Sequence, residues 1–243
     1  MPSLVLSGSY EELNTKIFKS LVRKDMIVVD IGANVGYYTL LFSKLVGKTG
    51  KVFAFEPEPH NFSLLMENIF LVNNFLNVYP VNKAVGHSTD KALLFPTYYR
   101  GATHTLYSTG KCNEGIFVQV TKLDDFFKET SVTVDIIKID IDGAEPFALL
   151  GMRDVLTRNR RIKILTEFSP PHLKKAGSSA IKYWDILLSL EFNYLYLIDE
   201  KHNAVYLTTL DKVMKYCKNN LFRRDLAASL LCSKTPMKEM KLN

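Results

Sequence analysis

Cysteine is scarce in this chain of 243 residues. Cys112, Cys217 and Cys232 form no Cys-x-x-Cys pair, which argues against a disulfide framework and against a zinc site. The chain also has no run of about 18 apolar residues, and residues 1–10 lack the charged start and long apolar centre of a signal peptide. We therefore expect reduced thiols, no transmembrane segment and a cytoplasmic protein.

Extremes of composition are absent as well. With 47% hydrophobic and 23% charged residues, the chain is typical of one sizeable α/β domain. The formal net charge is +6, and lysine and arginine are scattered except near the C-terminus, where they concentrate at positions 212, 215, 218, 223, 224, 234, 238 and 241. A solvated helical face and a frayed tail explain this cluster, and binding to RNA or to an anionic membrane surface stays open as the alternative.

The stretch from Ile27 to Val46 predicts a strand, a tight turn and a helix. A β-branched run leads into Asp30, glycines follow at 32 and 36, and apolar residues then recur at helical spacing. Glycine allows a sharp turn and the close approach of a ligand. The free N–H groups at the start of the helix would face that ligand at the carboxyl end of a parallel strand, so we expect a polar ligand there.

A second strand, Lys51 to Phe55, ends in Glu56 and Pro57. An acid at this point, some twenty residues after the glycine turn, is typical of a site that binds both ribose hydroxyls. The second and third glycines of the dinucleotide pattern are missing, because Asn34 and Tyr37 stand at those positions. The ligand is therefore expected to carry a nucleoside but no pyrophosphate.

Carboxylates gather at the ends of two later strands. A buried strand rich in isoleucine leads to Asp140, Asp142 and Glu145, and the strand 162–168 carries Glu167 near its end. Parallel strands end at one edge of a sheet, so these acids should lie beside the glycine turn. Ala84 follows the strand 78–81 at the same edge, where its small side chain would leave room for an adenine.

The remaining pattern completes an α/β chain. Helices are expected at residues 10–23, 61–73, 144–156 and 179–190, and short strands at 91–95 and 115–120. Between these strands, residues 96–113 include His104 and several tyrosines, which suits either a substrate wall or a surface hairpin. Residues 193–198 and 204–207 are expected to form a hairpin.

Five ordered motifs together resemble the FkbM family of S-adenosylmethionine-dependent methyltransferases: residues 29–40, 55–57, 84–86, 121–125 and 137–145. The resemblance implies an α/β, Rossmann-like, seven-stranded class I methyltransferase fold, with a mostly parallel sheet and a C-terminal antiparallel hairpin. We expect a helical segment at 1–25, the cofactor-binding domain at 26–209 and a basic helical tail at 210–243. The chain departs from the family pattern at Asp142, where glutamate is usual, and at Thr103 to Leu106, where Ser-Ser-Leu is common.

The resemblance also implies residue roles, with S-adenosylmethionine as cofactor. Asp140 is the first choice for the group that faces the methyl, and His104 and Glu167 are the other possible bases. A Mg²⁺ site at Asp140, Asp142 and Glu167 stays open, but we expect the acids to face the sulfonium without a metal. The expected cofactor-binding residues are Asp30, Gly32, Ala33, Asn34, Gly36, Glu56, Pro57, Ala84 and Asp140.

The implied reaction is O-methylation of a hydroxyl on a sugar, a lipid-like molecule or another small acceptor. Two alternatives remain at this level. One is an RNA methyltransferase that uses the basic C-terminal region, although the chain lacks an Asn-Pro-Pro-Tyr type of motif and any recognisable RNA module. The other is a subunit that binds S-adenosylmethionine without catalysis. The sequence does not indicate an oligomeric state.

Overall fold

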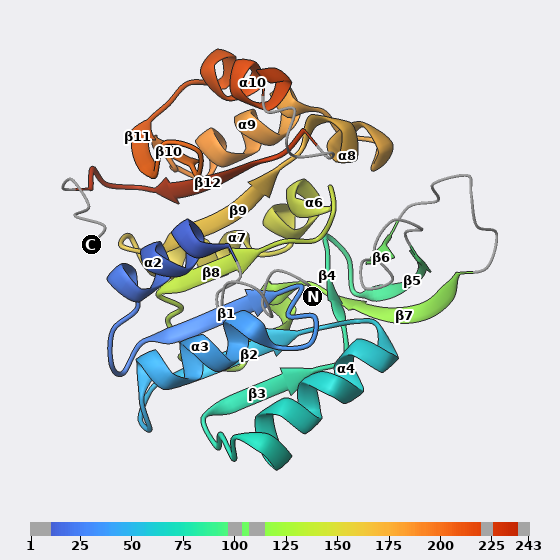
Figure 1. Cartoon of the computed structure of the whole chain (residues 1–243). Coiled ribbons are helices and arrows are strands. Elements are labelled where there is room, and N and C mark those ends of the chain that lie inside the picture. Colours follow the sequence, from blue (N-terminus) through green and yellow to red (C-terminus); the bar gives the residue numbers. More distant parts are fainter. Residues whose placement is uncertain (1–10, 97–103, 107–114, 220–225, 238–243) are drawn as a thin grey trace.

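The computed structural model describes residues 11–96, 104–106, 115–219 and 226–237. Its main sheet has the strand order β11-β10-β12-β9-β8-β1-β2-β3 (Figure 1). The five strands β9, β8, β1, β2 and β3 are parallel to one another. β12 runs antiparallel to both β9 and β10. The bounds are β1 Ile27–Ile31, β2 Lys51–Phe55, β3 Val78–Val81, β8 Ile136–Ile139, β9 Lys163–Phe168, β10 Tyr194–Asp199, β11 Ala204–Leu207 and β12 Ala228–Ser233.

Helices cover both faces of this sheet, so its central strands are buried on two sides and contain long apolar runs. On one face, α2, α3, α4 and the π-helical segment η1 pack over residues such as Val28 and Val52. On the other face, α5 to α10 pack over residues such as Val29 and Ile137. The bounds are α2 Glu12–Leu21, α3 Tyr37–Val46, α4 Pro59–Met66, η1 Glu67–Val72, α5 Leu123–Phe126, α6 Glu145–Leu150, α7 Arg153–Arg158, α8 Pro170–Lys175, α9 Ala180–Ser189 and α10 Leu210–Asn219.

A smaller sheet extends from the end of β3, in the order β4-β7-β5-β6 (Figure 1). It comprises β4 Ala84–Val85, β5 Asp90–Pro96, β6 His104–Thr105 and β7 Ile116–Thr121. The strands expected at 91–95 and 115–120 are thus confirmed, and they pair antiparallel with each other. Most of the connection between them, which was considered as a substrate wall, lies outside the described residues.

The C-terminal region differs from the basic helical tail that the sequence predicted over 210–243. Within the described residues of this region, the helix is α10, and β12 is a fully buried strand between β9 and β10. Ala228 to Leu231 are apolar apart from one serine. The strand pairs with β9 on one side and β10 on the other, so its backbone groups can be satisfied by neighbouring strands and not by water. The predicted hairpin of β10 and β11 is confirmed, and the sheet has eight strands in the described residues.

The helix expected over 144–156 is divided into α6 and α7 at Gly151. A Cβ atom at this position would lie 1.9 Å from the carbonyl oxygen of Gly86, at the beginning of the small sheet. This close approach packs the connection between α6 and α7 against the end of β4 in the small sheet. In the described part of the chain, no helix has the length and apolar character needed to cross a membrane.

Candidate active site

Four residues that the sequence singled out share one row at the edge of the main sheet. In the strand register, Ile31 is level with Phe55 and Ile139, and Ile139 is level with Thr166. The residues that directly follow these four are Gly32, Glu56, Asp140 and Glu167. Parallel pairing therefore brings together residues that are up to 135 positions apart in the sequence (167 − 32 = 135).

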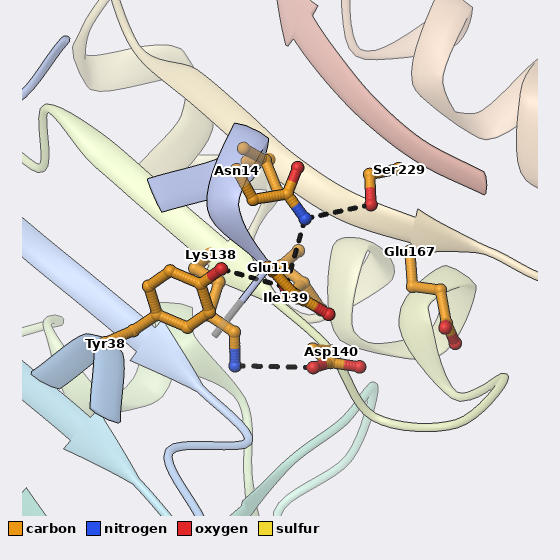
Figure 2. A pocket seen from close by; sticks show the side chains of 9 residues that line it. Glu11, Asn14, Tyr38, Lys138, Ile139, Asp140, Glu167 and Ser229 are labelled. Carbon is orange, nitrogen blue, oxygen red and sulfur yellow. Dashed lines mark hydrogen bonds and ion pairs between the residues drawn. The ribbon is translucent and has the colours of Figure 1, made fainter. Parts of the chain in front are cut away.

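A polar pocket opens beside this row, on the side of α2 and α3 (Figure 2). Its wall includes the Asp140 and Glu167 side chains, with Lys138 between the sheet and Tyr38. The Tyr38 hydroxyl donates to Glu11 over 2.8 Å, and burial with the Glu11 charge raises the pKa of Tyr38 above its usual range, so the phenol stays protonated. The lining residues are Glu11, Asn14, Tyr38, Lys138, Ile139, Asp140, Leu165, Glu167 and Ser229.

Ser229 shows that the C-terminal strand belongs to the site. It pairs with Glu167 across the β9–β12 ladder, and its hydroxyl accepts a hydrogen bond of 3.1 Å from the Asn14 side chain. The Asn14 amide also donates to Glu11 over 3.0 Å. The pocket wall therefore joins α2, at the beginning of the described chain, to β12 near its end.

A second, mostly apolar pocket lies on the other side of Gly32. Its lining includes Leu94 of β5, Leu106 next to β6, and Ile141 in the turn after β8. The lining residues are Ile31, Gly32, Phe55, Pro57, Lys83, Ala84, Val85, Leu94, Leu106, Ile141 and Ala144. An apolar wall with backbone groups at its edges suits a flat heterocycle such as adenine.

Lys138 is the important residue that the sequence reasoning missed. Its side chain is 6% exposed, and its ammonium lies 3.3 Å from Asp30 and 3.7 Å from Asp140. It also donates to the carbonyl oxygen of Gly32 over 2.9 Å. Burial lowers the pKa of Lys138, but the charges of Asp30 and Asp140 outweigh that effect and raise it overall, so the lysine stays charged. A lysine within a buried isoleucine run was the available signal, because such a lysine needs an acidic partner.

Asp30 lies beneath the site. The residue is fully buried, its carboxylate accepts a hydrogen bond of 2.7 Å from Thr39, and it lines neither of the two pockets. The expected role of Asp30 in holding the amino-acid end of the cofactor stays a prediction. The influence of Asp30 on the site passes through Lys138, its ion-pair partner.

Glu56 is buried at the end of β2, with its carboxylate turned toward the glycine turn. Its two oxygens accept hydrogen bonds of 2.8 Å from the Asn34 N–H and 3.0 Å from the Glu58 N–H. Burial raises the pKa of Glu56 to about 7, against the lowering effect of these N–H groups. Each carboxylate oxygen keeps a second acceptor direction, and binding of ribose hydroxyls there stays a prediction.

The two motif glycines are favoured by the chain itself, for different reasons. Gly32 has φ +78°, and a Cβ atom there would lie 2.1 Å from the carbonyl oxygen of Asp140. Gly36 has φ +102°, and a Cβ atom there would lie 2.8 Å from the end of the Leu65 side chain, which can shift. Packing against backbone therefore requires glycine at position 32, whereas at position 36 the positive φ favours it.

The other predicted cofactor residues surround the turn. Pro57 and Ala84 line the apolar pocket, Ala33 is buried, and the Asn34 side chain accepts a hydrogen bond of 2.8 Å from the Val35 N–H. The backbone of His104 lies in β6, where it pairs with Pro96, but its side chain lies outside the described residues. The structure therefore brings Asp140 and Glu167 together, and the predicted role of His104 stays a prediction.

The other acids after β8 have separate positions. Glu145 turns inward, where its carboxylate accepts hydrogen bonds from the Ile141 and Gly143 N–H groups at 3.1 and 3.2 Å. Burial first, and then the charge of Glu167, raise the pKa of Glu145 to about 8. Asp142 forms a cluster with Glu167 and His172, which excludes Asp140. The trio left open for Mg²⁺, Asp140, Asp142 and Glu167, thus differs from the group that the fold assembles.

Comparison with known proteins agrees with this geometry. The family model of the methyltransferase FkbM domain matches residues 30–196, which is more than half of the chain. A 2-O-methyltransferase, NoeI, from Sinorhizobium fredii is 27% identical over 196 residues, covering 74% of this chain and 78% of that protein. Methyltransferase 1 from Beauveria bassiana is 29% identical over 152 residues, and the match covers 54% of this chain and 59% of that protein.

Solved structures share the fold at low sequence identity. A Streptococcus mutans protein described as a methyltransferase, in complex with SAH, has a TM-score of 0.53 and 12% identity, with 92% of this chain and 97% of that chain covered. A SAM-dependent O-methyltransferase from Thermotoga maritima has a TM-score of 0.53 and 11% identity, with coverage of 98% and 72%. These likenesses confirm the class I methyltransferase fold. From the family match and this fold together, the chain belongs to the FkbM methyltransferase family, and its cofactor is S-adenosylmethionine.

Proposed function

We propose that this protein transfers a methyl group from S-adenosylmethionine to a hydroxyl group of a sugar, a lipid-like molecule or another small acceptor in the cytoplasm. The observation that carries the proposal is the pair Asp140 and Glu167, which stand on one row at the sheet edge and line the same pocket. A carboxylate at that place can orient a hydroxyl and accept its proton. The distant relative named 2-O-methyltransferase supports an oxygen acceptor.

The charges of the polar pocket suit the amino-acid end of the cofactor. Glu11, Asp140 and Glu167 contribute carboxylates and Lys138 one ammonium, so the lining has an excess of negative charge. S-adenosylmethionine carries a sulfonium and an ammonium, which such a pocket attracts. The apolar pocket near Ala84 would hold the adenine, and Glu56 would accept the ribose hydroxyls.

In this reaction, S-adenosylmethionine supplies an electrophilic methyl group. The acceptor oxygen forms a bond to the methyl carbon as the carbon–sulfur bond breaks, and the hydroxyl proton passes to a carboxylate. Asp140 is the proposed base, since its side chain is 40% exposed at the pocket and Lys138, 3.7 Å away, stabilises its charge before transfer. Holding oxygen, carbon and sulfur in line would supply the larger part of the acceleration.

The experiment combines an acceptor screen with the variant Asp140→Asn. The chain is incubated with radiolabelled S-adenosylmethionine and cell extract, and the label is fractionated into saccharide, lipid, RNA and protein pools. Once an acceptor is found, Asp140→Asn should lower kcat about 10²- to 10⁴-fold with nearly unchanged affinity for the cofactor. Asp185→Asn, at an exposed position on α9, is the matched control.

Four outcomes would count against the proposal or a part of it. A raised KM for S-adenosylmethionine with an unchanged kcat in Asp140→Asn would assign Asp140 to cofactor binding, and a loss confined to Glu167→Gln would move the base to Glu167. Label found only in RNA would support the RNA methyltransferase alternative. The sequence favoured that alternative through its basic C-terminal region. Part of this region is the buried strand β12, which weakens the argument for RNA binding. Cofactor binding without any labelled pool would support a non-catalytic subunit.

A further inference from the structure

A cluster of metal-ligating side chains lies where the turn after β8 meets the loop after β9. One ligand atom from each of Asp142, Glu167 and His172 can be chosen so that all of them lie within 4.8 Å of one another. The His172 Nδ1 is 3.6 Å from an Asp142 oxygen and 3.8 Å from a Glu167 oxygen. The three side chains keep 23%, 21% and 18% of their surface exposed in the same order, whereas the facing atoms His172 Nδ1 and Glu167 Oε2 are themselves buried.

These separations are wider than those of a hydrogen-bonded pair. The same residue types meet at Asp199 and His202, where the distance between His202 Nδ1 and a carboxylate oxygen is 2.7 Å. Donor atoms bound to one ion at about 2.1 Å lie about 3.0–3.4 Å from each other, so a shift of less than about 1 Å would bring His172 Nδ1 to coordination spacing with each of the two carboxylate oxygens. The cluster therefore has the spacing of a cation site, whereas the pair at His202 has that of a hydrogen bond.

The backbone holds the cluster together. Gly143, with φ +102°, packs so closely on the next loop that a Cβ atom would lie 2.5 Å from the His172 carbonyl oxygen. Asp142 itself has φ +52°, and the buried Glu145 carboxylate accepts the N–H groups on both sides of it, those of Ile141 and Gly143. The elements that carry the donors are thus fixed against one another before any ion binds.

We propose that Asp142, Glu167 and His172 bind a divalent first-row transition metal ion, with Mn²⁺ as the best fit. Two carboxylate oxygens and one imidazole nitrogen suit such an ion, because imidazole favours transition metals while carboxylates suit Mg²⁺, Ca²⁺ and Mn²⁺. Three protein donors leave coordination positions open. This site replaces the metal-free arrangement that the sequence suggested, and it includes a histidine that the sequence reasoning left outside the ligand set.

The use of the ion rests on the proposed function. Glu167 lines the pocket that Asp140 also lines, so an ion held by Glu167 would lie at the edge of the acceptor's binding place. There it would bind the acceptor oxygens, position them, and lower the pKa of the hydroxyl that is methylated. The expected acceptor class is accordingly one with two neighbouring oxygen ligands, such as a vicinal diol of a sugar.

The test measures metal binding without any cofactor or acceptor. Mn²⁺ is titrated into the full chain, and free Mn²⁺ is followed by electron paramagnetic resonance. The parent should bind one ion, and Asp142→Asn and His172→Ala should each weaken binding at least about tenfold. His202→Ala, which removes the histidine of the hydrogen-bonded pair, should bind as the parent does. Asparagine tolerates positive φ, so Asp142→Asn keeps the turn and decides the matter if His172→Ala does not fold.

Absence of Mn²⁺ binding by the parent, or parent-like binding by folded Asp142→Asn, would overturn the site. The role of the ion is tested separately with the acceptor from the radiolabel screen. Methyl transfer that continues at the same rate after treatment with EDTA would overturn that role while leaving the proposed function intact. Binding of Mn²⁺ together with no methylation of any hydroxyl acceptor would support the cation site and reject the proposed function.

Discussion

At the scale of single residues, Lys138 determines the charge balance beneath the site. It lies in the centre of a buried strand and contacts Asp30, Asp140 and the Gly32 carbonyl oxygen at once. Its ammonium also lies 5.5 Å from the centre of the Tyr38 ring. Removal of one partner of such a buried ion pair is costly, because the charge that remains has lost its water as well as its partner.

We therefore predict that Lys138→Met lowers the free energy of unfolding by about 3–5 kcal/mol, because Asp30 stays buried without a cation. Urea denaturation monitored by circular dichroism measures the loss. The double variant Asp30→Asn with Lys138→Met should recover a large part of it, since both charges are then gone. Equal losses in the single and the double variant would show that packing of the lysine stem, and not the charge, is the cause.

At the scale of elements, the turn between β1 and α3 is fixed by contact with the end of β8. Gly32 and Gly177 have the same φ of +78°, but their surroundings differ. A Cβ atom at Gly32 would lie 2.1 Å from a backbone oxygen, whereas nothing lies within 4 Å of a Cβ atom at Gly177. The pair separates the cost of an unfavourable φ from the cost of a steric clash.

Alanine at both positions gives the prediction. Gly177→Ala should cost about 1–2 kcal/mol for the left-handed conformation alone. Gly32→Ala should cost at least about 2 kcal/mol more, because Asp140 directly follows the central strand β8 and its N–H donates to Ile31 of β1, so its carbonyl oxygen cannot shift freely. Thermal and urea unfolding of both variants provide the values. Similar losses would mean that the turn can move away from β8, and Gly32 would then be open to the ligand-approach role first expected for it.

At the scale of the whole molecule, burial of carboxylates makes stability depend on pH. Glu145 has a pKa of about 8 in the folded protein, above the ordinary value of 4.5, because burial disfavours its charged form. A raised carboxyl pKa contributes stability that is fully present below pH 4.5 and is lost as the pH rises through 8. The unfolded chain releases this proton more readily, so a higher pH favours unfolding.

We predict that Glu145→Gln removes this part of the pH dependence. Relative to the parent, the variant should gain about 2–4 kcal/mol of stability between pH 4.5 and pH 9, since glutamine has no proton to lose and its oxygen still accepts the turn N–H groups. Urea unfolding at several pH values without cofactor checks it, and Glu129→Gln at an exposed position is the control. A constant difference between Glu145→Gln and the parent would contradict the raised pKa.

The sequence by itself determined the features that depend on neighbours in the chain. The pattern from Val28 to Gly36 predicted a strand, turn and helix, and the apolar run before Asp140 predicted a buried strand. Because parallel strands end at one edge, the meeting of Gly32, Glu56, Asp140 and Glu167 could also be inferred before their register was known. The motifs were sufficient to identify the family, which the family match confirms.

Only the tertiary structure decided which distant groups pair. The basic lysines and arginines around β12 obscured a strand that is buried between β9 and β10, because charge in sequence does not tell which residues of a segment face the core. The inward turn of Glu145 and the approach of His172 to Asp142 depend on the close contact at Gly143, between two loops that no local pattern connects. Lys138 likewise acquires its role from Asp30, which lies 108 residues earlier (138 − 30 = 108). The register of β1 and β8 places the two residues opposite each other.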